Sequence, residues 1–269
     1  MKWLSRFYMV LIFLILYAPI LVVVLFSFNE SGSLSEFTGF TAYWYRDLLR
    51  DGEALTALKN SLILAILSSL LATVVGTLAA FSIYRASNKR YQRLLESVAN
   101  IPMMNPDIVT GVSMMLLFVG VTTVLKINNI LGFWTMLFAH TTFNLPYVIL
   151  SVLPKFRQMD KNLTEAALDL GCTPAQTFMR VELPSILPGI VSGLMMCFTL
   201  SLDDFVISHF VSSPDFKTLP LYIYNQTAHE VKFSMYALCT LMIVAILVLL
   251  ILVNVAGAAG ERKQKRSRG

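Results

Sequence analysis

Residues 165–184 read EAALDLGCTPAQTFMRVELP, and they separate two long runs of the chain that are almost entirely apolar. Most residues at the start of this stretch favour an α-helix. A polar, helix-forming segment held next to membrane-spanning helices is suited to dock a soluble protein. The sequence on either side decides whether such helices are present.

The stretch divides at Gly171. A glycine commonly ends a helix, and Thr173-Pro174 has the chemistry of a helix cap followed by a first helical residue. We predict a second short helix from there toward Glu182, ended by Pro184 and Pro188. The sequence therefore predicts two short helices around a glycine elbow, which together form a compact knob.

The composition places the rest of the chain in a membrane. Hydrophobic residues make up 56% of the sequence and charged residues only 14%, which is outside the usual range of soluble proteins. The charges fall between uncharged runs, each close to the roughly 20 residues that a helix needs to cross the bilayer. Because backbone groups in lipid must be hydrogen-bonded internally, helices are expected. The predicted fold class is all-α: a polytopic membrane protein with six transmembrane helices.

The uncharged runs predict six spans and three regions. The spans are residues 1–28, 59–84, 98–120, 129–153, 186–207 and 233–256, and the third is interrupted near Pro102 and Pro106. The regions are an N-terminal helix with its outer loop (1–57), a core of five spans (58–256) that includes the polar loop 156–184, and a basic tail (257–269).

The distribution of Lys and Arg predicts the orientation. If the N-terminus is cytoplasmic, the inner segments hold 15 of the 21 basic residues, so both termini and the polar loop are predicted to be cytoplasmic. The net charge of +5 then reflects topology, with membrane lipid as the expected partner of the tail. Nucleic-acid binding is not predicted.

No motif for catalysis or metal binding is found in the sequence. The three cysteines show no CxxC spacing, and His140, His209 and His229 are isolated, so neither a disulfide nor a metal site is predicted. The sequence contains no GxxxxGK[ST] phosphate-binding loop, no HExxH pair and no GxSxG elbow. We therefore predict a protein that is not an enzyme and holds no cofactor of its own.

Asp107 lies inside a predicted span. It is ten residues into the third one, about 15 Å along the helix axis and so near mid-membrane. A carboxylate at that depth is costly unless it faces protein or water. Since Asn105-Pro106-Asp107 also has the chemistry of a helix start, the alternative is a buried aspartate that caps the helix where it restarts.

Asp203 and Asp204 form a second acidic feature, near the outer end of the fifth span and just before Phe205. Adjacent helical residues point about 100° apart, so we expect one acid to face a translocation path and the other a neighbouring helix or the outer loop. Two acids and an aromatic ring can hold a cation. The alternative is a polar helix end at the membrane interface.

Gly189 and Gly193 are four residues apart in the same span. Small residues at this spacing let two helices approach closely, so we predict a packing contact there.

The stretch 165–184 resembles the EAA loop of binding-protein-dependent ABC importer permeases, in which EAA is followed by Gly and then by Ile-x-Leu-Pro. Val181 stands in place of the Ile. An ordinary linker between spans is the alternative, and the number of matching positions disfavours it. The resemblance implies a type I (MetI-like) importer permease fold. It also assigns contact with an ATPase to Glu165, Ala166, Ala167, Asp169, Gly171, Leu183 and Pro184.

Other segments are similar to the PotC-type permeases of spermidine/putrescine ABC importers. They are MNPDIV (104–109), GFW (132–134), FAHTTF (138–143) and FTLSLDD (198–204). This resemblance implies a permease of the bacterial inner membrane that moves polyamines inward past Asp107, Asp203, Asp204 and Phe205. It also implies a homologous second permease, an extracytoplasmic substrate-binding protein, and two ATPase subunits that hold ATP and Mg.

Other functions remain open at this point. The same ABC permease role could serve another small cationic solute. A secondary cation transporter driven by an ion gradient would be expected to show two hydropathy-related halves around broken helices, and no such halving is seen. A membrane enzyme would need one of the catalytic motifs that are absent.

Overall fold

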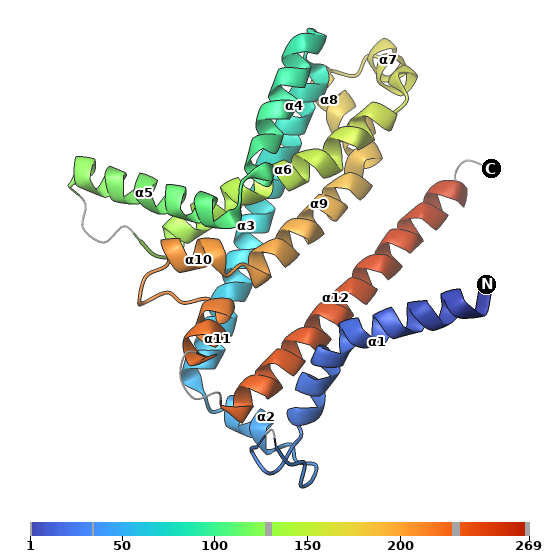
Figure 1. Ribbon diagram of the computed structural model, residues 1–269. Helices are drawn as coiled ribbons and strands as arrows, with labels where there is room; N and C mark the ends of the chain where they lie inside the picture. Colours follow the sequence, from blue (N-terminus) through green and yellow to red (C-terminus); the bar gives the residue numbers. More distant parts are fainter. Residues whose placement is uncertain (1, 34, 127–130, 228–231, 267–269) are drawn as a thin grey trace. The chain divides into compact units, whose positions relative to one another are not determined.

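The computed structural model describes residues 2–33, 35–126, 131–227 and 232–266, and most of them lie in helices (Figure 1). Within those ranges the extended pairings are the isolated bridges Asn29–Phe40 and Ser213–Phe216. The predicted all-α class is confirmed. His229, residues 129–130 of the predicted fourth span and residues 267–269 of the predicted tail lie outside the described residues.

Six helices of the described chain correspond to the six predicted spans. Five are long and apolar enough to cross a membrane: Trp3–Phe26 in α1 (Lys2–Phe26), α3 (Gly52–Arg85), α5 (Asp107–Leu125), α6 (Phe133–Gln158) and the helical stretch Pro174–Asp203. The sixth is the shorter apolar segment Phe233–Val248 of α12 (Phe233–Arg266). The prediction of a polytopic membrane protein agrees with these helices.

The third span begins later than predicted. Residues 98–104 belong to a separate amphipathic helix, α4 (Lys89–Met104), which has no buried residue. The chain is extended at Asn105, and Asp107 is the first residue of α5. Proline disfavours the helical conformation of the residue before it, so Pro106 separates the two helices. The placement of Asp107 ten residues into a span was therefore wrong. The helix does restart after Pro106, but Asp107 is exposed and Pro106 occupies the cap position, so the alternative of a buried capping aspartate was wrong as well.

The second knob helix does not end at Pro184, contrary to the prediction. It begins as α8 (Pro174–Thr177), continues through the π-helical segment η1 (Phe178–Glu182) and enters α9 (Leu183–Asp203) without a break. The N–H of Leu183 donates to the carbonyl of Phe178, five residues back. The wider π turn accommodates the ring of Pro184, which in a regular helix would clash with the carbonyl four residues earlier.

The fifth span also ends earlier than predicted, at Asp203 and not at residue 207. Asp204 is extended, and a new short helix, α10 (Val206–Val211), starts two residues later. The predicted outer loop between the fifth and sixth spans, residues 208–232, contains most of α10 and the helix α11 (Leu219–Thr227).

The chain divides into two compact units. One comprises Met1–Thr56 and Tyr222–Gly269, in which α1, α2 (Tyr43–Leu48) and α12 pack together. Its loop after α1 is organised by Asn29, whose carbonyl accepts a hydrogen bond from Trp44 Nε1 at 2.7 Å. The ring of Trp44 lies 5.5 Å from that of Phe233 at the start of α12.

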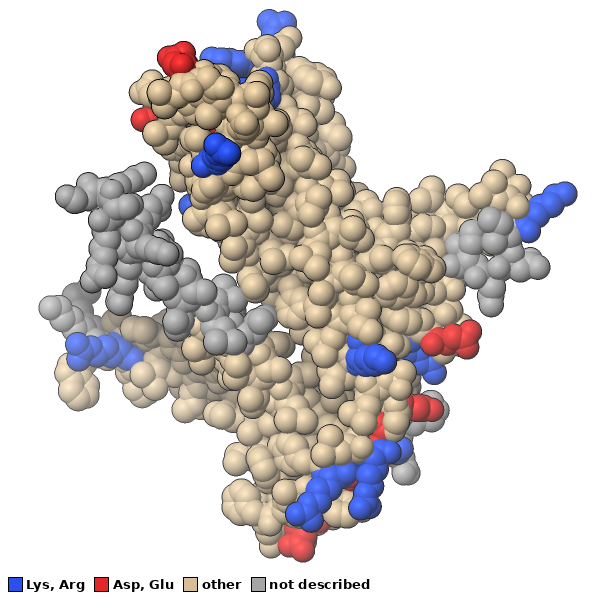
Figure 2. Space-filling view, turned by 180° about the vertical axis from the view of Figure 1, so that it is seen from behind, with Lys and Arg blue, Asp and Glu red and all other residues tan. Residues whose placement is uncertain are grey.

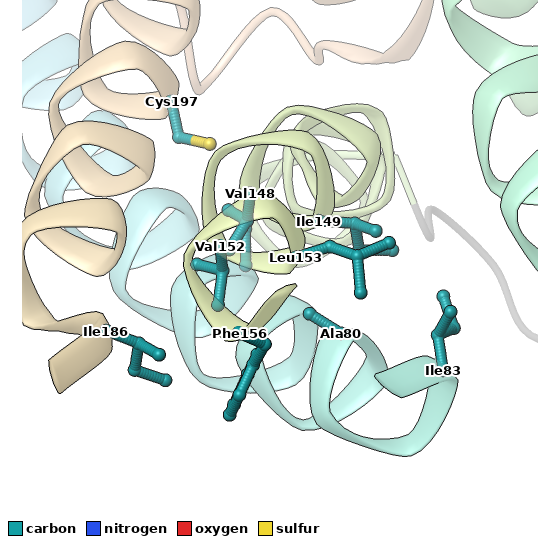
Figure 3. Packing of buried hydrophobic residues seen from close by; sticks show 10 residues of the cluster. Ala80, Ile83, Val148, Ile149, Val152, Leu153, Phe156, Ile186 and Cys197 are labelled. Atoms are coloured by element: carbon teal, nitrogen blue, oxygen red, sulfur yellow. The ribbon is translucent and has the colours of Figure 1, made fainter. Parts of the chain in front are cut away.

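The other unit, Ala57–Leu221, has its core between α3, α6 and α9 (Figure 3). Val148, Val152 and Phe156 of α6 are fully buried there, with Ala80 from α3 and Ile186 from α9. The dense packing of these helices fixes the frame on which the polar sites of this unit are built.

The predicted GxxxG contact is confirmed in this core. A methyl group on Gly189 would lie 2.8 Å from the carbonyl oxygen of Ser151 and 2.7 Å from Lys155 Cγ, and one on Gly193 would lie 3.3 Å from Val148 Cα. The backbones of α9 and α6 therefore approach too closely for a larger residue at Gly189.

Charge is unevenly distributed over the Ala57–Leu221 unit. In Figure 2 blue and red atoms gather at its upper end, where α4 and α7 (Lys161–Asp169) lie, and the adjoining surface is almost wholly tan. An apolar belt next to a charged end is the pattern that a bilayer imposes on a spanning protein.

Candidate coupling and translocation sites

The predicted glycine elbow is present between α7 and α8. Asp160 caps α7 by accepting a hydrogen bond from the N–H of Asn162, and Thr173 caps α8 by accepting one from the N–H of Gln176. Between them Gly171 has a φ of +83°, in the left-handed region that favours glycine. The N–H groups of Gly171 and Cys172 close the end of α7 on carbonyls of that helix. The elbow and the starts of both knob helices thus lie where the sequence predicted them, although the second helix continues past Pro184.

Part of the surface of the knob is exposed to solvent. Glu165, Ala166 and Asp169 are exposed, whereas Ala167 is buried. Leu170, at the end of α7, has 86% of its surface exposed. An exposed face that combines carboxylates with a large apolar side chain is suited to a protein partner. Of the remaining predicted contact residues, Gly171 and Pro184 are exposed and Leu183 is partly buried.

Glu182 is a residue of the knob that the sequence did not single out. Its side chain is fully buried, and Oε1 lies 2.7 Å from Nη2 of Arg85, the last residue of α3. The same oxygen accepts a hydrogen bond from the hydroxyl of Thr164 at 3.3 Å. A lone glutamate at the edge of an apolar span is the signal that could have found it, because a charge there needs a partner.

Asp107 and Asp203 both lie close to the contact between α5 and α10. At Gly111 of α5, an added methyl group would lie 3.5 Å from the backbone of both Val206 and Ile207. Asp107 is one turn before Gly111 on the same face of α5, and Asp203 precedes Val206 by three residues. Both carboxylates are exposed. Each of these two predicted path residues thus lies within about one helical turn of the α5–α10 contact along its own segment.

Asp204 has a different environment from Asp203. Its carboxylate accepts hydrogen bonds from the N–H groups of Ile207, at 3.3 Å, and Ser208, at 2.8 Å, and so caps α10. Oδ2 also lies 3.4 Å from Nε2 of His140 in α6, and only 9% of the side chain is exposed. Asp204 thus faces a neighbouring helix, one of the two environments expected for the pair.

His140 sits at the centre of a buried polar network. Its Nδ1 is 2.7 Å from the hydroxyl of Ser201, and Nε2 is 3.2 Å from that of Ser208. Ser201 is in turn 2.9 Å from the hydroxyl of Ser68 in α3. Both ring nitrogens of His140 thus have partners among the side chains of the helix core.

Phe205 follows the two acids and is partly buried. Its ring lies 5.4 Å from that of His209, which is 5.4 Å from the ring of Phe210. An aromatic row of Phe205, His209 and Phe210 therefore starts two residues after Asp203 and continues into α10. In the described part of the chain no group of three or more His, Cys, Asp or Glu side chains could hold a metal ion.

Residues 72–265 match the family described as "Binding-protein-dependent transport system inner membrane component". The chain belongs to this family. As a member of it, the chain is a permease subunit of the inner membrane, and the prediction of a non-catalytic subunit is confirmed on that ground.

Curated relatives place this permease more closely. It is 37% identical over 234 residues to the putrescine transport system permease protein PotI of Escherichia coli (strain K12), covering 87% of this chain and 83% of that one. It is also 37% identical over 244 residues to the spermidine/putrescine transport system permease protein PotC of Haemophilus influenzae, covering 90% and 91%. The predicted resemblance to polyamine permeases is confirmed as homology.

Solved structures confirm the fold of the permease. A chain of a bacterial ABC transporter for import of the acidic polysaccharide alginate superposes with a TM-score of 0.74 at 17% identity, covering 97% of this chain and 95% of that one. A chain of the inward-facing MetNI methionine ABC transporter gives a TM-score of 0.57 at 20% identity, covering 84% and 99%. The type I importer permease fold is thus confirmed.

Proposed function

We propose that this permease moves polyamines, spermidine and putrescine among them, from the extracytoplasmic side into the cytoplasm. Support comes from the homology to polyamine permeases and from two exposed carboxylates, Asp107 and Asp203, beside the α5–α10 contact. The exposed carboxylate of Asp203, two residues before the aromatic row that starts at Phe205, is the observation that carries the proposal.

The charge of a polyamine explains why such groups are needed. The substrate carries several ammonium groups, and moving them bare across a low-dielectric layer of about 30 Å would be prohibitive. Fixed carboxylates attract the ammonium groups, and aromatic faces such as that of Phe205 add cation–π attraction. Asp203 and Asp107 supply the charge in this path, with Asp204 holding α10 in place behind them.

Transport would be driven by subunits outside this chain. Two ATPase subunits that bind ATP and Mg, a homologous second permease and an extracytoplasmic binding protein complete the proposed complex. The knob formed by α7 and α8 docks on one ATPase through its exposed residues Glu165, Ala166 and Asp169. ATP closes the ATPase dimer and opens the spans outward to receive substrate, and hydrolysis returns them to the inward state.

This assignment places the knob and both termini in the cytoplasm. A cysteine introduced at exposed Ser87, in a variant lacking the three native cysteines, should be shielded from an impermeant thiol reagent in intact cells. A cysteine at Ser33 should react. Labelling of Ser87→Cys from outside would show that the proposed orientation is wrong.

The decisive experiment is uptake of labelled spermidine and putrescine into vesicles that contain the assembled complex. We expect Asp203→Asn and Asp107→Asn each to lower uptake at least tenfold, about 1.4 kcal/mol on the limiting step. Asp215→Asn removes the same charge from an exposed loop position and serves as the matched control. Parent rates in both path variants would exclude these acids, and competition by an unrelated organic cation at equal potency would favour a different cationic substrate.

A further inference from the structure

We propose that Glu182 transmits movement of the knob to the membrane helices through its bonds to Arg85 and Thr164, here called the Glu182 cluster. This inference rests on the proposed docking of an ATPase on the knob. It assigns a positioning role to a residue outside the set that touches the ATPase.

The cluster joins three elements through one carboxylate oxygen. Thr164 belongs to α7 and directly precedes Glu165, Arg85 ends α3, and Glu182 is the last residue before α9. Both Nη2 of Arg85 and the hydroxyl of Thr164 bond to Oε1 of Glu182. A displacement of α7 therefore acts on the end of α3 and the start of α9 at the same time.

Burial makes these bonds resistant to separation. No part of the Glu182 side chain is exposed, and a buried carboxylate that loses its partner is strongly unfavourable. Within the described residues Arg85 is its one ion-pair partner, and Oε2 has no hydrogen-bond partner. The three elements consequently move together at lower cost than they move apart.

The surroundings hold Arg85 in place for this role. Its guanidinium carbon lies 5.3 Å above the ring of Phe81, one turn earlier in α3. The ring of Phe81 packs at 4.9 Å against that of Phe178, the first residue of η1. The ion pair and the ring contact thus link α3 to both ends of the π-helical segment. Such segments interrupt regular hydrogen bonding and are frequent at functional sites.

The test uses the assembled complex in proteoliposomes, with its loaded binding protein outside. Uptake and ATP hydrolysis are measured together, so that their ratio reports coupling. We expect Glu182→Gln and Thr164→Val to lower the substrate imported per ATP at least fivefold, with the KM for loaded binding protein unchanged. Arg85→Gln should act similarly, and Arg85→Lys, which keeps the charge, should recover more than half of that loss.

A matched control lies on the neighbouring surface. Arg157 of α6 pairs with Glu96 of α4 and makes no ion pair with α7 in the described structure. Arg157→Gln should therefore keep the parent ratio. A parent ratio in both Glu182→Gln and Thr164→Val would overturn the inference. So would failure of Thr164→Val to assemble, since the cluster would then serve folding. Failure of the parent complex to import polyamine would instead refute the proposed function.

Discussion

The imidazole Nε2 of His140 lies 3.4 Å from Oδ2 of Asp204, and this contact joins α6 to the start of α10. The same carboxylate caps α10, and the other ring nitrogen of His140 bonds to Ser201 in α9. Asp204 thus stabilises the start of α10 and its contact with α6, whereas the neighbouring Asp203 is exposed. Adjacent acids of one motif therefore carry separable roles.

Replacement of Asp204 tests that division. Asp204→Ala removes the cap of α10 and leaves His140 without its carboxylate, which should cost about 2 kcal/mol of stability. Thermal unfolding of the purified complex measures the effect. Asp203→Ala removes an exposed side chain of equal size and should leave unfolding unchanged. An equal loss of stability in both variants would contradict the separation of roles.

The backbone conformation at Gly171 alone should decide which residues can replace this glycine. No atom of a neighbouring element lies within 4 Å of the position that a methyl group would occupy there, so the cost comes from its φ of +83°. Gly171→Val should add strain of about 1–3 kcal/mol, misplace the knob and abolish uptake while the outside protein still binds substrate. Gly171→Asn, which accepts this conformation more readily, should keep most uptake. Normal uptake by the valine variant would remove the elbow from the coupling mechanism.

Helix packing can be tested with a pair of matched glycine substitutions. Gly189→Ala places a methyl group 2.8 Å from the backbone oxygen of Ser151, so α9 and α6 must separate. We expect a loss of about 1–3 kcal/mol in unfolding free energy. Gly120→Ala, on α5, meets nothing within 4 Å and should be neutral. If the two variants unfold alike, close approach at Gly189 is not required.

Asp51 should make the stability of the unit that comprises Met1–Thr56 and Tyr222–Gly269 depend on pH in the acidic range. Burial raises the pKa of Asp51, but hydrogen bonds from the N–H of Ala54, the Tyr222 hydroxyl and the N–H of Glu53 outweigh it and bring the pKa below its ordinary 3.8. A lowered folded-state pKa stabilises above the ordinary value, and this contribution is lost as pH falls through the lowered one.

The expected cost of Asp51→Ala at pH 7 is therefore about 1 kcal/mol, the usual value of a helix cap, and it should shrink below pH 3.8. Thermal unfolding of the detergent-purified protein across this range measures it. Tyr222→Phe removes one of the bonds and should show a smaller difference with the same sign. A cost that stays constant with pH would mean that the carboxylate charge plays no part.

Structural features that depend on residues close together in the sequence could be predicted from it. The spans followed from runs without charge, and the elbow followed from Gly171 and Thr173-Pro174, because each signal lies within a few residues. The interruption near Pro106 was predicted from the proline itself, but hydropathy placed it inside the third span and not at its start. The break at Asp204 was missed, since hydropathy does not register where a capping acid ends a helix. The bond between Arg85 and Glu182 joins residues 97 positions apart, and only the packing of α3 against the knob brings them together.

The π-helical segment Phe178–Glu182 has a consequence for how the length of this protein can vary. A π turn holds one residue more than the α-helical turn it replaces, so deletion of exposed Met179 would keep both flanks in their present register, at the cost of a closer contact between the ring of Pro184 and the preceding turn. A deletion between Leu183 and Gly189 would instead rotate one flank by about 100° and turn the glycine face away from α6. Relatives that differ by a single residue here are expected to have gained or lost it in this turn.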